Sequence, residues 1–501
     1  MKQLNKFFIA LPILILVFGS CSKGKDERSS ATGWKYNDQE WGGFEKLDYE
    51  GQIIGPNLVP IEGGTFNMGL TDQDVTFEWN NIPRRVTVSS FYMDETEVAN
   101  IDYREYLHWL RRVYVSYPKV HMEALPDTLV WREELAFNEP LVETYFRHPS
   151  FDDYPVVGVN WVQSNNYCKW RTDRVNEMIL IERGILNPSP DQKDSENFNS
   201  KAYLTGQYTG NVKKNLPNLT DGTERAVRFE DGILLPDYML PTEAQWEYAA
   251  LALQGNQPGS MDELITDRRL YPWNGNTARY KKHTKTQGDI LANFKRGRGD
   301  YMGMSGALND NASIPGPVRD FLPNDFGLFN MAGNVSEWTA DVYRPQTSTT
   351  LGDPENQDLN SYRGNEFKEL ILDEEGKPAE KDSLGMLRYK TVDDESVRDR
   401  ENYRKGNVKN YKDGDADYIK YGYGITTLIN DSSRVIKGGS WADRLFWLSP
   451  GARRFKDQNV GDRTLGFRCA VVRVGAEGFD GDKGGNEFKE GKGSNVKRRY
   501  K

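Results

Sequence analysis

Short apolar runs separated by long polar stretches make up the pattern of this chain. Leu58 to Gly69 predicts two short strands around a Gly-Gly turn, and Arg85 to Met93 alternates as a further strand. Helical spacing follows from Asp94 to Arg112. The residues expected on the inner face of that helix are Val98, Ile101, Tyr106 and Trp109.

Later segments also predict regular structure. Pro155 to Trp161 predicts a buried strand that leads into a helix, and a last strand pair is expected at Arg434 to Trp441 and Leu465 to Ala470. Another helix is expected to start at Thr242, whose hydroxyl can cap the free amides. Gln245, three residues later, completes a capping box.

Two polar insertions interrupt this pattern. They are expected at about residues 173–238 and 345–430. The second has few apolar anchors and cannot bury enough surface to fold alone, so we expect a long solvated excursion, although its charge runs also serve solubility alone. With a polar tether over residues 21–57 and a flexible polar tail over residues 475–501, one main domain is expected at residues 58–474.

The N-terminus has the features of an export signal. Lys2 and Lys6 precede an apolar run from Phe7 to Phe18, which is shorter than the ~20 residues that a spanning helix needs. Small residues then precede Cys21, which predicts a lipoprotein signal peptide at residues 1–20 and acylation of the cysteine. We expect a lipoprotein of the cell envelope, in the outer membrane and facing the periplasm, although Ser22 and Lys23 after the anchor do not decide the leaflet. The alternative is an ordinary secretory signal with a chance cysteine.

Composition narrows the class of protein. The chain has 65 basic and 74 acidic residues and a net charge of -9, which argues against a general nucleic-acid binder. Hydrophobic residues make up 37% and aromatic residues 12%, which indicates a core built from Trp, Tyr and Phe. Besides Cys21, the cysteines are Cys168 and Cys469. Export permits a disulfide between them, and two buried free thiols are the alternative.

An ordered series of motifs resembles the formylglycine-generating-enzyme, or sulfatase-modifying-factor, family. The matching segments are Ile61 to Gly69, Phe91 to Val98, Val157 to Trp161, Leu240 to Tyr248, Tyr271 to Trp273, Gly327 to Trp338, Gly438 to Trp441 and Gly466 to Cys469. Each is weak alone, and together they extend from Leu58 to Val474 in the family's order. The resemblance implies an irregular α+β fold, distantly like C-type lectins, with long polar insertions. It also implies that Cys168 and Cys469 form the family's structural disulfide.

Catalysis in this family depends on two cysteines that bind copper and activate oxygen. They lie two and seven residues after the aromatic residue of the Gly-Gly-Ser-aromatic motif, which is Trp441 in this chain, and those positions hold Asp443 and Leu448. Neither side chain supplies the thiolate that copper and the reaction need. The histidines show no metal-ligand spacing: His108, His121, His148 and His283. The resemblance therefore implies a member without copper that is not an enzyme.

Calcium is a separate prediction, because the family has two structural calcium sites built from oxygen ligands. The ligands of the first site map onto Asn293, Phe294, Asp300 and Met302. The ligands of the second site map onto Asn330, Gly333, Val335 and Glu337. The alternative is that these polar groups only cap loops.

Two further segments narrow the resemblance to the gliding-motility lipoproteins of the Bacteroidetes. Ala31 to Asp38 and Trp79 to Pro83 look like the J type of these proteins, whereas the related K type begins its domain closer to the acylated cysteine. The resemblance implies a structural role in gliding motility and type IX protein secretion. The expected partners are other envelope proteins of that machinery, the K-type lipoprotein among them, and the membrane through the anchor, with no nucleic acid.

Two other functions stay open. A copper-free enzyme could use Asp443, Arg444 and Arg453 near the former reaction centre, although paired Asp and Arg more often form a salt bridge. A calcium-braced carbohydrate or peptide receptor could use exposed aromatic residues of the segment 345–430, although most aromatic residues are expected in the core.

Overall fold

The structure is a computed structural model. It describes residues 28–49, 51–70, 75, 77, 79–134, 137–208, 210–252, 269–281, 287–295, 314–343, 368–391 and 432–475. Cys21, the predicted signal peptide and residues 476–501 of the predicted tail lie outside these ranges. Within them, no helix combines the length and the apolar character that crossing a membrane requires.

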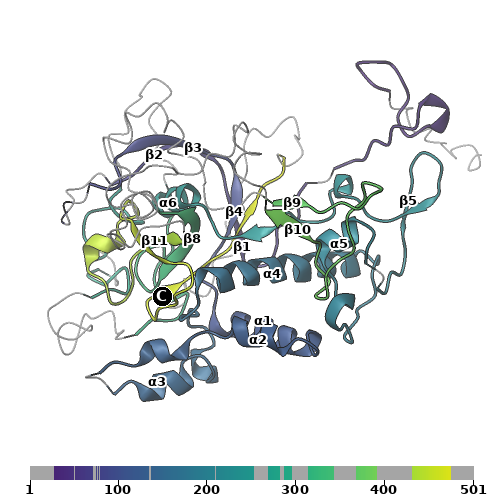
Figure 1. Ribbon diagram of the computed structural model, residues 1–501. Coiled ribbons are helices and arrows are strands. Elements are labelled where there is room, and N and C mark those ends of the chain that lie inside the picture. Colours follow the sequence, from purple (N-terminus) through teal and green to yellow (C-terminus); the bar gives the residue numbers. More distant parts are fainter. Residues whose placement is uncertain are drawn as a thin grey trace, which may run out of the picture.

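One antiparallel sheet joins the two ends of the domain (Figure 1). In order of pairing its strands are β1 (Leu58–Ile61), β4 (Phe91–Asp94), β14 (Ala470–Val472) and β7 (Tyr238–Met239). All residues of β4 are buried, and Met93 lies opposite both Val59 and Ala470. The last strand therefore closes the domain by packing against one of the first.

A second four-stranded sheet carries the C-terminal motifs. Its order is β12 (Arg454–Asp457), β11 (Ser433–Lys437), β8 (Ser336–Val342) and β13 (Leu465–Gly466), with β13 parallel to β8 and the other pairs antiparallel. The remaining strands form three pairs: β2 (Gly64–Met68) with β3 (Arg84–Val88), β5 (Leu216–Pro217) with β6 (Glu224–Arg225), and β9 (Lys368–Leu370) with β10 (Tyr389–Thr391).

Helices α1 to α4 lie on one side of the sheets, with α4 beside the first sheet and α1 next to α4 (Figure 1). The α-helices are α1 (Asn100–Val113), α2 (Pro118–Ala124), α3 (Glu139–Thr144), α4 (Trp161–Glu182), α5 (Ser200–Leu204) and α6 (Glu243–Leu251). The 3-10 helices are η1 (Gln39–Trp41), η2 (Thr128–Trp131), η3 (Pro149–Phe151), η4 (Asp194–Glu196), η5 (Phe229–Asp231) and η7 (Leu445–Leu448). The predicted capping box of α6 is confirmed, because the Thr242 hydroxyl accepts from the Gln245 amide and the Gln245 side chain accepts from the Thr242 amide.

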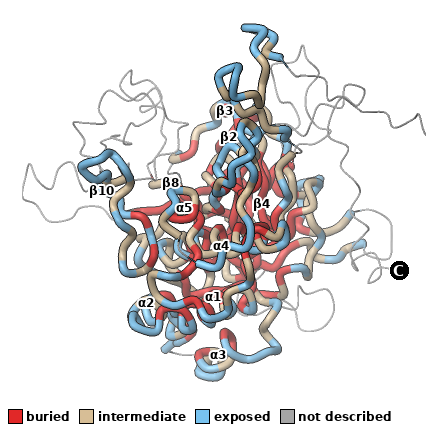
Figure 2. Tube along the Cα trace, turned by 90° about the vertical axis from the view of Figure 1, so that its right-hand side faces the viewer, coloured by how far each residue is buried: buried red, intermediate tan, exposed pale blue. Residues whose placement is uncertain are grey.

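Aromatic side chains fill the main core, as the composition predicts. Buried residues gather in the middle of the molecule around β4 and α4 (Figure 2). The Tyr103 ring stacks on the Tyr167 ring at 5.6 Å between centroids, and the Phe467 ring packs edge-on against Tyr167 at 5.4 Å. These rings bring together α1, α4 and the segment before β14.

The two short strands expected around the Gly-Gly turn are confirmed as β1 and β2, which pair with β4 and β3 respectively. Two other strand predictions are wrong. The expected single strand from Arg85 to Met93 is two strands, β3 and β4, divided at Ser89 and Ser90. The segments expected as a last strand pair belong to different partners: β11 pairs with β8 and β12, β13 with β8, and β14 with β4 and β7. Strands this short contain too few residues for the sequence pattern to specify which strand pairs with which.

Two local expectations also need correction. Val156, Val157 and Val159 are buried as expected, but the segment forms only the isolated bridge between Ala99 and Pro155 instead of a strand. In α1, Ile101 is 45% exposed, because the helix begins at Asn100 and its buried stripe runs through other positions. That stripe includes Tyr103, Tyr106, Leu107, Trp109, Leu110 and Val113.

The first predicted insertion is built into the core. Its expected first residues, 173–182, continue α4, and Phe198, Tyr203 and Leu234 join the main hydrophobic cluster. The described part of the second insertion, residues 368–391, rests against the first: the Leu384 carbonyl accepts from the Asn197 side chain at 2.7 Å. The boundaries of both insertions stay predictions, since most of residues 345–430 lies outside the described ranges.

The predicted tether contacts the first insertion through a partly buried ion pair. The Glu45 carboxylate accepts from the Arg225 guanidinium at 3.0 Å and from the Leu219 amide at 3.0 Å. Trp34 and Trp41 contact each other edge-on at 6.3 Å and are 55% and 36% exposed. This ion pair and uncharged hydrogen bonds, such as that from the Gln52 side chain to the Val472 carbonyl, attach the tether, whereas the two tryptophans are largely exposed.

Candidate functional site

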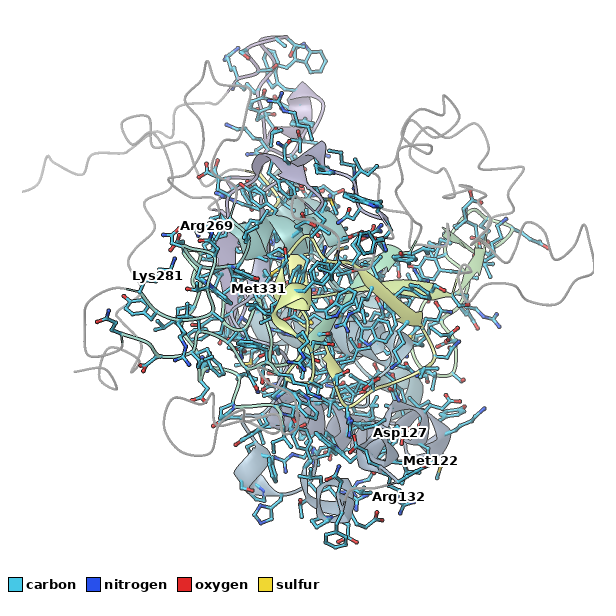
Figure 3. All side chains as sticks on the ribbon, turned by 90° about the vertical axis from the view of Figure 1, so that its left-hand side faces the viewer. Met122, Asp127, Arg132, Arg269, Lys281 and Met331 are labelled. Carbon is cyan, nitrogen blue, oxygen red and sulfur yellow. The ribbon has the colours of Figure 1, made fainter. Side chains whose placement is uncertain are left out.

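A buried cluster of one carboxylate and three amides joins the two predicted calcium sites. Glu97, just before α1, is fully buried, and its two oxygens accept from the Asn330 side chain at 2.9 Å and the Asn334 side chain at 3.0 Å. The Asn334 oxygen accepts from the Asn293 side chain at 3.3 Å. Burial raises the pKa of Glu97 to about 8, against the opposing effect of Arg468. Met331, which follows Asn330, lies near the centre of the molecule in Figure 3.

The first predicted calcium site contains an observation that fits a hard cation. Asn293 is fully buried, and its side-chain oxygen has no hydrogen-bond partner among the described residues. An unpartnered buried amide oxygen costs roughly 1–3 kcal/mol, and an oxygen-seeking cation would compensate that cost. Phe294 is buried beside it, whereas Asp300 and Met302 lie outside the described residues. The described half of this site therefore suits calcium.

The carboxylate of the second predicted site already has a counter-ion. Both oxygens of Glu337 accept from the Arg468 guanidinium at 2.7 Å, and one also accepts from the Trp246 indole at 2.7 Å. Arg468 is fully buried and also donates to the Phe329 carbonyl at 2.8 Å. A cation at this site would share Glu337 with Arg468, so this carboxylate fits calcium less well than Asn293 does.

The backbone around the second site is left-handed at three positions. Asn330 and Asn334 have positive φ angles of 54° and 60°, and Gly333 has a φ of 77°. A Cβ on Gly333 would lie 2.3 Å from the Asn293 carbonyl oxygen, so a side chain does not fit there. Val335, whose carbonyl is the remaining predicted ligand, is fully buried. No three His, Cys, Asp or Glu side chains of the described ranges come together as a metal-binding group.

An ion pair includes Asp443, the position at which the resemblance places the first catalytic cysteine. The Asp443 carboxylate accepts from both terminal nitrogens of Arg454, at 2.7 and 2.6 Å, and from the Ser440 hydroxyl at 2.6 Å. Leu448, at the position of the second cysteine, is fully buried in an apolar cluster. The two positions at which the resemblance expects thiols therefore hold a carboxylate paired with an arginine and an aliphatic side chain.

Arg453 lies in a different buried charge network from the one expected. Its guanidinium contacts Glu243 at 2.6 Å, and Lys437, also fully buried, contacts Glu247 at 3.0 Å. The Asp341 carboxylate accepts from the Glu243 amide at 2.5 Å. Arg453 therefore joins α6 to the second sheet and is not a partner of Asp443.

The two remaining cysteines meet in the core. The sulfur atoms of Cys168, on α4, and Cys469, just before β14, are 3.1 Å apart, and both residues are buried free thiols. A disulfide bond measures about 2.05 Å, so these sulfurs touch without being bonded. Burial raises the pKa of the Cys469 thiol well above its ordinary value. The structure brings the predicted partners together, and their oxidation stays a prediction.

Comparison with known proteins identifies the family. The model of the sulfatase-modifying factor enzyme 1-like domain matches residues 44–473. The chain belongs to this family. Its mixed helices and sheets are the α+β fold of the family, as the motifs predict.

Curated relatives of this sulfatase-modifying factor chain include enzymes and proteins named as inactive. The formylglycine-generating enzyme of Mus musculus is 25% identical over 64% of this chain and 69% of its own length. The inactive C-alpha-formylglycine-generating enzyme 2 of Bos taurus is 24% identical over 59% of this chain and 73% of its own. Chaperone protein LppX of Paenibacillus barcinonensis is 23% identical over 57% and 71%.

Solved structures align over most of the chain at low identity. PvdO from Pseudomonas aeruginosa aligns with a TM-score of 0.41 and 16% identity over 85% of this chain and 100% of its own. Treponema denticola variable protein 1 aligns with a TM-score of 0.36 and 17% identity over 85% and 98%.

Sequence reasoning missed the buried network around Glu97. Glu97 lies inside the motif from Phe91 to Val98 that carries the family resemblance, but its role as partner of Asn330 and Asn334 depends on residues more than 230 positions away. The one local signal is an acidic residue directly before the apolar Val98 and the start of a helix.

Proposed function

We propose that this chain is a non-catalytic lipoprotein of the cell envelope that acts by binding other envelope proteins. The observation that carries the proposal is the Asp443–Arg454 pair with the buried Leu448 at the positions of the copper-binding cysteines. A carboxylate with its charge balanced and a side chain without donor atoms cannot replace thiolates that bind a soft metal. The relatives named as inactive and as a chaperone support a role of this fold without catalysis.

The finer role that we propose is in gliding motility and type IX secretion, as a J-type lipoprotein acylated at Cys21. The surface offered to partners would include the described part of the second insertion where it lies on the first. The Gln207 side chain donates to the Pro378 carbonyl at 2.9 Å, and the Lys381 side chain donates to the Ser195 carbonyl at 2.6 Å. Segments added to a conserved type of domain are where such proteins commonly meet partners.

We further propose that calcium braces the domain, with Asn293, Phe294, Asp300 and Met302 around one ion. Asn330, Gly333, Val335 and Glu337 would surround a second. The buried Asn293 oxygen without a partner supports the first site most directly. Calcium would here hold loops together and supply no chemistry.

The direct test of the absent activity is copper-dependent oxidation of a peptide thiol by the purified chain. The formylglycine-generating enzyme of Thermomonospora curvata, a relative 25% identical to this chain, serves as the positive control under the same conditions. We expect no oxygen consumption and no aldehyde above the level of copper alone. Turnover by this chain comparable with the control would overturn the proposal.

The test of the cellular role is deletion of the gene, followed by measurement of colony spreading and of protein secretion. We expect both to be lost in the deletion strain and restored by the wild-type copy. A Cys21→Ala copy separates the contribution of the anchor, and an Asp443→Asn copy, expected to restore spreading, removes the carboxylate at nearly constant shape. Normal spreading and secretion without the gene would refute the motility role.

A further inference from the structure

The Glu97 carboxylate contacts asparagine side chains at both predicted calcium sites, and these contacts set the orientation of the side-chain amides. In its ionised form this carboxylate offers only acceptors, so each amide that faces it must then present its nitrogen. Asn330 and Asn334 both do so, one at each carboxylate oxygen, at 2.9 and 3.0 Å. Their own oxygens therefore point away from Glu97.

The orientation of the Asn334 amide in turn determines the orientation of the Asn293 amide at the first site. With its nitrogen on Glu97, Asn334 presents its oxygen to the Gly316 amide at 2.7 Å and to the Asn293 nitrogen at 3.3 Å. The Asn293 nitrogen also donates to the Ile314 carbonyl at 3.1 Å. Both contacts hold the nitrogen of Asn293, and its oxygen is the buried atom that has no partner among the described residues.

The second site receives the same orientation directly. The nitrogen of Asn330 donates to Glu97 and, at 3.1 Å, to the Val318 carbonyl. The Asn330 oxygen, the predicted ligand, lies on the opposite side of the amide. The left-handed backbone of Asn330, with a φ of 54°, further fixes the direction of its Cα–Cβ bond.

We propose that Glu97 is a positioning residue for both calcium sites: through Asn330 and through the relay from Asn334 to Asn293, one buried carboxylate turns two amide oxygens toward the cations. Glu97 touches neither ion in this proposal, and it acts through the amides that do. The inference rests on the proposed calcium bracing and adds that the two sites depend on one shared residue.

Glu97→Gln tests the proposal at nearly constant volume. A glutamine has one acceptor and one donor group, so it can face only one of the two amides without placing nitrogen against nitrogen. We expect at least one calcium site to weaken by roughly 10- to 100-fold, the usual effect of removing a group that orients a metal ligand. Isothermal titration of the calcium-stripped full chain with calcium chloride, at a pH above 8 so that Glu97 is ionised, measures both the affinity and the number of sites.

Asn334→Gly is a second variant that tests the same proposal if Glu97→Gln does not fold. Asn334 is not a predicted ligand, and glycine accepts its φ of 60° without strain. Removing the relay should weaken the first site and spare the second, so that the titration shows one tight site instead of two. The control is Glu243→Gln, a buried carboxylate paired with Arg453, which should lower the melting temperature and leave calcium affinity unchanged.

The outcomes separate this proposal from the one on which it rests. A wild-type chain that binds no calcium would refute the calcium bracing and the positioning role together. A wild-type chain that binds calcium, with Glu97→Gln and Asn334→Gly of equal affinity and stoichiometry, would refute the positioning role alone. Weakened binding in these two variants but not in Glu243→Gln supports it.

Discussion

Replacement of Glu337 by glutamine is the most informative test of how this core is held together. Glu337 and Arg468 are 1% and 0% exposed at the side chain, and two nitrogens of the guanidinium each lie 2.7 Å from a carboxylate oxygen. Glutamine keeps the shape and one acceptor but removes the charge. Arg468 then stays buried with one good hydrogen-bond acceptor fewer and without its principal counter-ion.

The expected loss follows from that geometry. Removing one partner of a buried ion pair costs about 3–5 kcal/mol, because the remaining charge stays in a medium of low polarity. The carbonyls of Phe329 and Asp94 still accept from Arg468, at 2.8 and 3.1 Å, so we expect the lower end of that range, about 3 kcal/mol. The free energy of unfolding comes from equilibrium denaturation in urea, followed by tryptophan fluorescence in the presence of a chelator.

The matched control makes the same substitution in a solvated pair. Glu375 contacts Lys377 at 2.9 Å, with both side chains more than 70% exposed, so Glu375→Gln should change stability by no more than the error of the measurement. A loss below about 1 kcal/mol for Glu337→Gln would refute the reasoning. It would mean that the nearby Glu97 carboxylate, which also acts on Arg468, can replace Glu337 as counter-ion.

Three further outcomes are expected. Thr242→Ala removes the acceptor for the Gln245 amide at the start of α6 and should lower the free energy of unfolding by about 1 kcal/mol in the same urea assay; an unchanged midpoint would contradict the cap. Burial raises the folded pKa of Asp341 to about 7, so between about pH 4 and 7 the folded state holds a proton that the unfolded state has released. Stability from this group is therefore present below that window and lost as the pH rises through it, and Asp341→Asn should flatten the decline of melting temperature over these pH values. Cys168 and Cys469 should form a disulfide in protein isolated from an oxidising compartment, so that thiol titration in denaturant detects them only after reduction; two thiols without reductant would show that the pair stays reduced.

Local signals predicted the parts of this fold that depend on neighbouring residues. The capping box at Thr242 and Gln245 involves groups three residues apart, so the sequence contains the whole interaction. Tyr106 and Trp109 were placed correctly on the buried face of α1, whereas Ile101 was not, because the phase of a buried stripe depends on where the helix begins and on what covers it. The order of the family motifs predicted the α+β fold.

The tertiary structure alone decided which charges meet. Asp443 pairs with Arg454, although Arg444 follows it in sequence, and Glu337 pairs with Arg468 across 131 positions. Strands of two to seven residues likewise take their partners from the packing of the whole domain. The sequence by itself determined the start of α6, the aromatic character of the core and the residue types at positions 443 and 448. Strand register and the pairing of buried polar groups came from the tertiary structure, because the free energy of burying a charge or an amide depends on partners that only the folded chain brings within hydrogen-bond distance.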